Sequence, residues 1–348
     1  MKKYLIAILS ILLALLSACT DETSTDSNSQ TAKNGDKSQQ IQAIEFWPAK
    51  VGNKEGFINK QGKFVINPQF DVVYYFHDGL ACVCIGQNMW QLDGRWGYIN
   101  KQGEYVINLQ FDDANNFSEG LARVEIGNRY GYIDTCGRYI INPQFDNAQD
   151  FSEGLAAVEV GDKYGYIDKT GKFIINPQFE DGGSFSENLA HVKIGDKYGF
   201  INKEGAFVIN PQFDDADAFS EGLAVVEMNE KYGFIDKTGQ HVIALQFDGA
   251  HEFSEGLASV RIGGKAGYID KKGDFIINPQ FDYAFEFSEG FAVVEIGNKK
   301  GYIDKHGRYV INPQYNYAFE FRGGLAPIWV DGKEGYIDKQ GNIIYMEP

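Results

Sequence analysis

The sequence predicts an all-β protein built as a tandem array of nine units. A glycine–aromatic–isoleucine tripeptide occurs nine times, and after a first spacing of 41 residues every spacing is 34. Such self-similarity at a fixed period is typical of repeat architectures. Each unit also contains several glycines together with short alternating runs of aromatic and β-branched residues, which favour strands. Three strands per unit are expected.

A helical repeat of the same period is excluded by the residues that break helices. The unit from 165 to 198 contains glycine at positions 165, 171, 182, 183 and 195 and proline at 177. In a helix interior each glycine costs about 1 kcal/mol and each proline about 3 kcal/mol relative to alanine. No stretch between these residues carries a helical apolar stripe, so the repeats are β-structured.

Residues 1–19 predict a lipoprotein signal peptide. Lys2 and Lys3 precede an apolar run from Leu5 to Leu16, which is typical of a secretory signal and short for a membrane span. The residues 16–19, Leu-Ser-Ala-Cys, resemble the lipobox of bacterial lipoproteins. That resemblance implies cleavage before Cys19, lipid attachment to its sulfur, and anchorage of the chain to a bacterial membrane. The alternative is an ordinary signal peptide with a chance cysteine.

The resemblance also bears on location. The folded part would lie outside the cytoplasm, in the cell envelope, and Thr20 after the cysteine would favour the outer membrane of a double-membraned cell. Residues 20–44 are mostly polar and offer almost nothing to bury, so they predict a flexible tether. At about 5–6 Å × √n, such a tether spans roughly 25–30 Å.

Residues 45–348 predict the array itself. In one unit, strands are expected over 155–161, 164–168 and 172–176, with a turn at Gly171 that recurs in all nine units and favours positive φ. Asn-Pro follows the third strand in six of eight units, with Leu109 and Leu245 as exceptions, and proline suits a strand end or edge. Each unit is therefore a three-stranded antiparallel meander closed by a turn-rich return segment, in which Phe179 and Phe185 are expected as apolar anchors.

The array can be open or closed. Propellers usually have four to eight blades of four strands, at about 40–45 residues a blade, and often close by mixing strands from the two termini. Nine units of 34 residues with three strands each fit that pattern poorly, and the termini show no offset. We therefore expect an open, twisted array rather than a closed propeller-like ring.

The units resemble the WG repeat, also called the KWG repeat, of bacterial proteins. Arg95, Trp96 and Gly97 match its opening literally, whereas tyrosine replaces tryptophan in four later units. A Phe-Ser-Glu-Gly-Leu-Ala element is intact four times, for example at 117–122, and drifts at 185–190 and 321–326. The resemblance covers about 300 residues and implies a repeat or interaction protein without a general catalytic motif.

Charge and side-chain chemistry narrow the function classes. The net charge is −16 and no basic stripe is present, which argues against nucleic acid as a partner. Recurring carboxylates in the return segments either hydrogen-bond backbone N–H groups in turns, which we expect, or bind Ca²⁺. The five histidines fall at different repeat positions, so no metal site, no cofactor and no catalytic constellation is expected. Cys82, Cys84 and Cys136 leave open one disulfide or none.

A candidate binding surface follows from comparing the units with one another. Positions that stay constant are structural, whereas outward positions that vary can recognise a partner. Aromatic residues at the variable positions gather in the first and last units, either for binding or to cover the ends of the array. The candidate binding residues are Tyr74, Tyr75, Arg123, His191, Arg261, Tyr283, Phe285, Tyr317, Phe319 and Trp329.

These observations predict a lipid-anchored, non-enzymatic repeat scaffold on the cell envelope that binds other envelope proteins. The alternative is a binder of glycan or peptidoglycan, using aromatic faces against sugar rings. An enzyme is the third possibility and is disfavoured, because a regular array lacks the single irregular pocket that chemistry needs.

Overall fold

The computed structural model describes residues 45–86 and 94–348, which belong to one compact unit. The segments expected as a signal peptide with Cys19 and as a tether, residues 1–19 and 20–44, lie outside the described residues. Within the described part of the chain all regular secondary structure is β. No helix there is long and apolar enough to cross a membrane.

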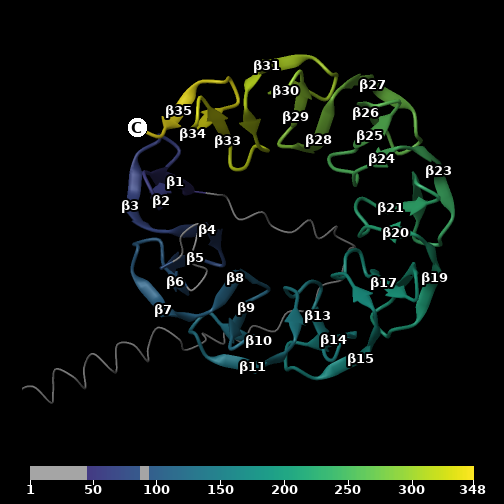
Figure 1. Cartoon of the computed structure of the whole chain (residues 1–348), viewed down its shortest axis with the longest axis horizontal. Coiled ribbons are helices and arrows are strands. Elements are labelled where there is room, and N and C mark those ends of the chain that lie inside the picture. The colour runs from purple at the N-terminus through teal and green to yellow at the C-terminus, as the bar shows by residue number, and fades with distance from the viewer. Residues whose placement is uncertain (1–44, 87–93) are drawn as a thin grey trace, which may run out of the picture. The chain divides into compact units, whose positions relative to one another are not determined.

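The strands form nine antiparallel sheets arranged as the blades of a ring, a β-propeller (Figure 1). Blade 1 has three strands, and each of blades 2–9 has four in sequence order. The expectation of an open array of three-stranded meanders is therefore wrong, although the all-β class and the nine repeats are confirmed. The first strand of each four-stranded blade lies toward the centre of the ring, and the last lies at its perimeter.

The strand bounds follow the four positions within a blade. The first strands are β4 (Val72–His77), β8 (Asp113–Ser118), β12 (Asn147–Ala148), β16 (Asp181–Gly182), β20 (Asp215–Ala216), β24 (Gly249–Ala250), β28 (Tyr283–Ser288) and β32 (Tyr317–Ala318). The second strands are β1 (Trp47–Val51), β5 (Leu80–Ile85), β9 (Leu121–Ile126), β13 (Leu155–Glu159), β17 (Ala190–Ile194), β21 (Leu223–Met228), β25 (Ala258–Ile262), β29 (Phe291–Ile296) and β33 (Leu325–Val330). The third strands are β2 (Lys54–Ile58), β6 (Arg95–Ile99), β10 (Arg129–Asp134), β14 (Tyr164–Asp168), β18 (Lys197–Ile201), β22 (Lys231–Asp236), β26 (Lys265–Ile269), β30 (Lys299–Asp304) and β34 (Lys333–Asp338). The outer strands are β3 (Phe64–Phe70), β7 (Tyr105–Phe111), β11 (Tyr139–Phe145), β15 (Phe173–Phe179), β19 (Phe207–Phe213), β23 (His241–Phe247), β27 (Phe275–Phe281), β31 (Tyr309–Tyr315) and β35 (Ile343–Met346).

The fourth strand of a blade is the segment that the sequence predicts as a return loop. In blade 3, β8 pairs with β9 in the register Asp113↔Glu125 and Phe117↔Ala122. In blade 4 the pairing shrinks to the two residues of β12, followed by an isolated bridge between Ser152 and Leu155. These segments are rich in Asp, Asn, Ser and Gly, so their local preference is for turns. Pairing with the neighbouring strand makes them strands.

The outer strand also runs further than predicted. β15 continues through Pro177 to Phe179 instead of ending at the Asn-Pro pair. Proline is tolerated there because β15 is the perimeter strand, whose free edge requires no N–H donor.

Two kinds of glycine are needed in each unit, for different reasons. Gly171 has φ of +85° in the turn before the outer strand, which confirms the expected positive φ. Gly165, in β14, has an ordinary φ, but a Cβ there would lie 2.6 Å from the backbone oxygen of Ile175. The pairing of β14 with β15 shifts register at this point, so the two backbones approach too closely for any side chain.

The hydrophobic cores lie between adjacent blades. One cluster joins Tyr166 and Phe179 of blade 4 to Phe185 of blade 5, and all three side chains are buried. Phe179 and Phe185 are thus anchors, as predicted. The Tyr166 hydroxyl also donates a 2.9 Å hydrogen bond to the carbonyl of Gly183 in the next blade. Each blade therefore completes the core of its neighbour, which is why a lone unit would be unstable.

The recurring serine and glutamate side chains clamp one blade to the next. Ser152 Oγ donates to the carbonyl of Phe185 at 2.7 Å, and Glu153 accepts from the N–H of Asn188 at 3.0 Å. Lys203 lies 3.0 Å from the same carboxylate. We call this serine–glutamate–lysine arrangement the blade clamp; its glutamates are Glu119, Glu153, Glu187, Glu221, Glu255 and Glu289. These carboxylates hold backbone N–H groups, as expected.

The ring closes where blade 9 meets blade 1, an interface that we call the seam. Trp47 is buried, and its Nε1 donates to the carbonyl of Arg322 at 2.9 Å. Tyr345 donates to the carbonyl of Lys50 at 2.5 Å and packs edge-on against Phe64. Among the residues that the structure describes, the seam thus closes by side-chain packing, without strand exchange between blades 1 and 9. The absence of an offset in the sequence was therefore no evidence for an open array.

Candidate functional site

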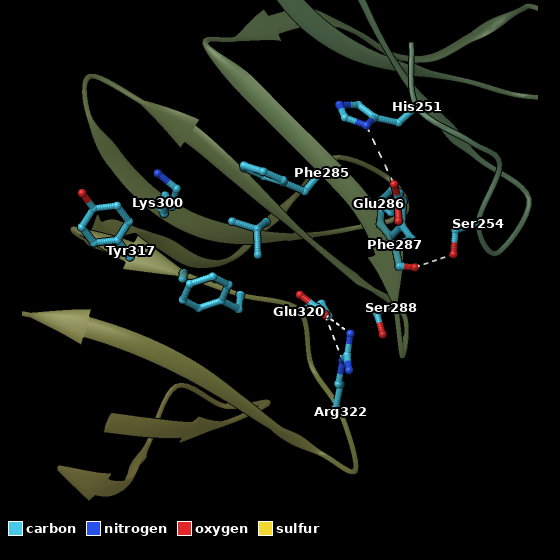
Figure 2. A pocket seen from close by; sticks show the side chains of 13 residues that line it. His251, Ser254, Phe285, Glu286, Phe287, Ser288, Lys300, Tyr317, Glu320 and Arg322 are labelled. Carbon is cyan, nitrogen blue, oxygen red and sulfur yellow. Dashed lines mark hydrogen bonds and ion pairs between the residues drawn. The ribbon is translucent and has the colours of Figure 1, made fainter. Parts of the chain in front are cut away.

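A pocket of about 500 Å³ lies at the inner side of blades 7–9 (Figure 2). Its aromatic lining includes Phe285, Phe319 and Tyr317, which are 43%, 50% and 54% exposed. Its charged lining includes Glu286 and Glu320. The volume falls within the range of about 300–1,000 Å³ typical of ligand sites.

Two aromatic side chains of the pocket, Phe285 and Phe319, occupy one repeat position on a fixed backbone. Phe285 lies in β28, and Phe319 follows β32 at the equivalent place. The carbonyl of Phe285 accepts a hydrogen bond from Tyr268 of the preceding blade at 2.7 Å, and that of Phe319 accepts one from Tyr302 at 2.9 Å. Because the backbone is held from one side, the phenyl rings are presented toward the opening. Asn115 stands at the same position in blade 3, so aromatic residues here are not required by the fold.

A glutamate follows each of these two phenylalanines: Glu286 follows Phe285, and Glu320 follows Phe319. Burial raises the pKa of Glu286 above its usual value, and the neighbouring charges of Glu320 and Asp217 raise it further. Burial also raises the pKa of Glu252, one blade earlier, with Glu286 and Asp217 adding to the effect. The three glutamates and Asp217 form a row of mutually repelling carboxylates across blades 6–9, and two of its members, Glu286 and Glu320, line the pocket.

The cations of the pocket are already paired. Arg322 donates to Glu320 from Nε at 2.9 Å and from Nη2 at 2.5 Å (Figure 2). Lys300 lies 2.6 Å from Glu295, and both side chains are largely buried. The nearest imidazole nitrogen to Glu286 is Nδ1 of His251 at 3.8 Å, beyond hydrogen-bonding distance. Glu286 is therefore the carboxylate of the pocket with the weakest compensation.

The predicted binding residues separate into three groups. Phe285, Tyr317 and Phe319 line the pocket. Beside them, Tyr283 lies under the guanidinium of Arg261, 5.0 Å from ring centroid to Cζ. Trp329 also lies beside the pocket, against Tyr317.

The Trp329 side chain packs edge-on against Tyr317, with ring centroids 5.8 Å apart. It is partly exposed, so the aromatic surface extends from the pocket onto the second strand of blade 9. The structure thus brings together the predicted residues of the last three blades.

The predicted residues of blades 2–5 serve packing and lie elsewhere. The ring of Tyr74 packs at a tilt against that of Trp96, with ring centroids 5.3 Å apart. Arg123 donates to the carbonyl of Ala148 at 2.7 Å. His191 covers Gly183, where a Cβ would lie 2.1 Å from its ring.

Tyr75 lies at the seam, in the hydrophobic cluster with Trp47 and Tyr336 and under the guanidinium of Arg322. Tyr75 thus has the covering role that was weighed against binding, at the closure of the ring, whereas Tyr74 packs within its own blade. Cys82, also in blade 2, is a buried free thiol that donates to the carbonyl of Ala114 at 3.5 Å.

Sequence reasoning missed the charged half of the pocket. His251, Glu286, Lys300, Glu320 and Arg322 were not predicted. A signal was present, because the position after the variable aromatic carries glutamate in three consecutive units, at 252, 286 and 320. Within the residues that the structure describes, no group of three or more His, Cys, Asp or Glu side chains is placed to hold a metal ion.

Comparison with protein families matches the WG-containing repeat to residues 56–88, 96–130, 130–164, 164–198, 198–232, 232–265, 267–299 and 301–333. The chain belongs to the WG-containing repeat family. In this WG-repeat propeller the sequence repeat is out of phase with the blade. The repeat at 164–198, for example, contains β14 and β15 of blade 4 followed by β16 and β17 of blade 5.

Solved structures of similar fold share little sequence with the WG-repeat propeller. A crystal structure of the eukaryotic initiation factor superposes with a TM-score of 0.62 at 12% identity, covering 87% of this chain and 96% of that chain. Hsv2p from Kluyveromyces lactis superposes with a TM-score of 0.42 at 10% identity, covering 65% of this chain and 92% of that chain. Puromycin hydrolase superposes with a TM-score of 0.39 at 10% identity, covering 76% of this chain and 58% of that chain. The first likeness concerns the fold alone, and the two lower scores support no comparison. No curated protein matches the sequence.

Proposed function

We propose that this WG-repeat propeller is a lipid-anchored, non-enzymatic binding protein of the bacterial cell envelope. The pocket of blades 7–9 is its recognition site, and the ligand is another envelope protein. One observation carries the proposal: the exposed aromatic side chains of blades 8 and 9 converge on a single pocket, whereas the aromatic residues of blade 2 are used in packing. Exposed aromatic anchors in a concavity are typical of binding sites.

The polar groups of the pocket favour binding over catalysis. Ser254 donates to the carbonyl of Phe287 at 2.7 Å, and Ser288 donates to that of Phe321 at 2.8 Å. Both hydroxyls thus belong to the blade clamp and are not paired with a general base. A nucleophile within hydrogen-bonding reach of such a base is what acyl or glycosyl transfer through a serine would need.

Anchoring is proposed from residues 1–44. Lipid on Cys19 would hold the ring to the membrane, and the polar segment of residues 20–44 would separate the two. In cells given a radiolabelled fatty acid, the full chain is expected to carry label and to fractionate with membranes. A Cys19→Ala variant is expected to lose both. Label retained by that variant would contradict the anchoring part.

Partner binding is tested by site-specific photocrosslinking in cells. Benzoylphenylalanine in place of Phe319 is expected to capture one envelope protein, and the same residue in place of Phe207, on an outer strand of blade 5, is expected to capture none. Capture at both positions, or at neither, would contradict a protein partner at the pocket.

The glycan alternative is favoured by the same aromatic faces, since sugar rings stack on exposed aromatic side chains. Saturable co-sedimentation of the propeller with purified cell wall, lost in a Phe285→Ala variant, would support it. No saturable co-sedimentation would reject it.

A further inference from the structure

We propose that the pocket of blades 7–9 recognises the cationic end of a basic side chain, lysine or arginine, on the partner protein. The aliphatic stem of that side chain would lie against Phe285 and Phe319, and its charge would face Glu286. The inference rests on the proposed function in one respect, namely that the source of the cation is a protein.

The charge balance of the pocket calls for a cation. Arg322 and Lys300 are each held by a carboxylate of their own, at 2.5 and 2.6 Å. Among the described residues, the one basic group close to the half-exposed Glu286 is His251, with its Nδ1 3.8 Å away. A buried or half-buried carboxylate without a hydrogen-bonded counterion is costly, so this group gains most from an incoming ammonium or guanidinium.

The neighbouring carboxylates strengthen that preference. Asp217, Glu252 and Glu286 come from three successive blades, and burial is the first cause of the raised pKa of each. The charge of Asp217 raises the pKa of both glutamates further, whereas the charge that raises the pKa of Asp217 is that of Asp215. Such repulsion is relieved by a bound cation and increased by a bound anion. The pocket therefore selects against acidic ligands.

The aromatic faces suit the stem and the charge of the same group. Long basic side chains bury their methylenes on apolar surface and keep the charged end polar. The protein already uses this pairing beside the pocket, where Lys300 lies 5.3 Å from the ring centroid of Tyr317 and Arg261 lies 5.0 Å from that of Tyr283. Cation–π contacts of this kind contribute about 0.5–2 kcal/mol.

The charge of the whole chain acts in the same direction. With a net charge of −16, the protein attracts basic partners at long range and repels acidic ones. Long-range attraction raises the association rate, whereas the pocket supplies the specific contact.

The test uses the full-length protein in detergent micelles and two capped pentapeptides that differ at their central residue, lysine in one and the neutral isostere norleucine in the other. Saturation-transfer NMR titration measures both. We expect the lysine peptide to bind about tenfold more tightly, the effect of one charge-assisted contact. Equal affinity for the two peptides would overturn the proposal.

Two variants of the protein test whether the cation binds in the pocket. Glu286→Gln keeps the shape of the side chain and is expected to lower affinity for the lysine peptide about tenfold. Glu125→Gln removes one negative charge from β9 in blade 3 and is expected to leave the affinity unchanged. If both variants weaken binding equally, the effect is net charge alone and the pocket assignment is wrong.

Two further outcomes separate this inference from the proposed function. If the Phe319 crosslink forms but is unaffected by Glu286→Gln, the protein partner stands and the basic side chain is rejected. If 1,4-diaminobutane binds and the lysine peptide does not, the source is a free amine, and the assignment to a protein side chain is rejected. Thermal unfolding of Glu286→Gln at or above the wild-type temperature excludes misfolding as the cause of lost binding.

Discussion

Replacing Trp47 by alanine should open the ring at the seam. The indole is 1% exposed, and its Nε1 donates a 2.9 Å hydrogen bond to the carbonyl of Arg322 in blade 9. At the same repeat position blade 3 carries Ala122, which pairs with Phe117 of the first strand of its blade. Blade 1 has no such strand among the described residues, so the larger side chain of Trp47 fills the space.

The expected loss of stability is large compared with what the remaining contacts of the seam contribute. Truncating a buried tryptophan to alanine costs about 3–5 kcal/mol, of which about 1 kcal/mol is the hydrogen bond. The seam lacks the blade clamp as well, because Gly323 stands where the other late blades carry glutamate. The hydrogen bond from Tyr345 to Lys50 and the packing of Phe64 remain. We therefore expect the seam to separate before any other interface.

Distances between spin labels measure the opening directly. Labels attached to p-acetylphenylalanine at positions 61 and 340, exposed turns of blades 1 and 9, avoid the native cysteines. Electron–electron double resonance should give one narrow distance distribution in the wild type and a broader, longer one in Trp47→Ala. Trp47→Phe keeps most of the apolar bulk and should remain narrow, with a loss of only about 1 kcal/mol in stability.

A second label pair decides whether the change is local. Positions 170 and 204 are the equivalent exposed turns of blades 4 and 5. If this pair broadens as much as the seam pair in Trp47→Ala, the variant loosens the whole ring and the reasoning is wrong. An unchanged seam pair in a folded Trp47→Ala variant would refute it equally.

Three further predictions concern the blades and the pocket. Gly165→Ala should destabilise the ring by about 3 kcal/mol, because its Cβ would lie 2.6 Å from backbone atoms. Gly154→Ala, at φ +87° with no atom within 4 Å, should cost about 1–2 kcal/mol; equal midpoint shifts in urea would contradict this. Tyr166→Phe should cost about 1 kcal/mol by losing a buried hydrogen bond, and Phe200→Tyr, at the same repeat position, should change stability in the opposite direction in the same assay. Since the folded state raises the pKa of Glu286 above the usual 4.5, its ionisation opposes folding. Glu286→Gln should therefore raise the melting temperature at pH 7, and the gain should vanish as the pH falls below 4.5; a gain independent of pH would contradict it.

The local parts of the fold could be read from the sequence. The turn at Gly171 needs a positive φ, and the third strand around Gly165 carries the repeat signature, so both are visible in one unit. The first strands of the four-stranded blades were missed; β12, for example, pairs over only two residues and lies in a segment rich in turn-favouring side chains. Its conformation comes from its partner strand and from the Ser152 hydrogen bond to the next blade, neither of which leaves a local pattern.

Only part of the candidate site could be predicted from the sequence, for a related reason. Phe285, Tyr317 and Phe319 stand out because they are aromatic at positions where other units are polar. Glu286 does not stand out, since glutamate is common in this acidic chain, and its importance appears only when the neighbouring blades bring other carboxylates beside it. The packing of Tyr75 could not be predicted from the sequence, because its environment depends on where the first and last blades meet.

By itself, the sequence determined the all-β class, the nine units, the turn glycines and the strands next to them, because these depend on φ preferences and alternation within about ten residues. Only the tertiary structure decided that the units close into a ring. Closure depends on the small rotation between neighbouring blades, which is set by core packing and accumulates over nine interfaces to a full turn. The pocket depends on the same rotation, because it is the curvature of the ring that brings Phe285, Phe319 and Glu286 to one concave surface.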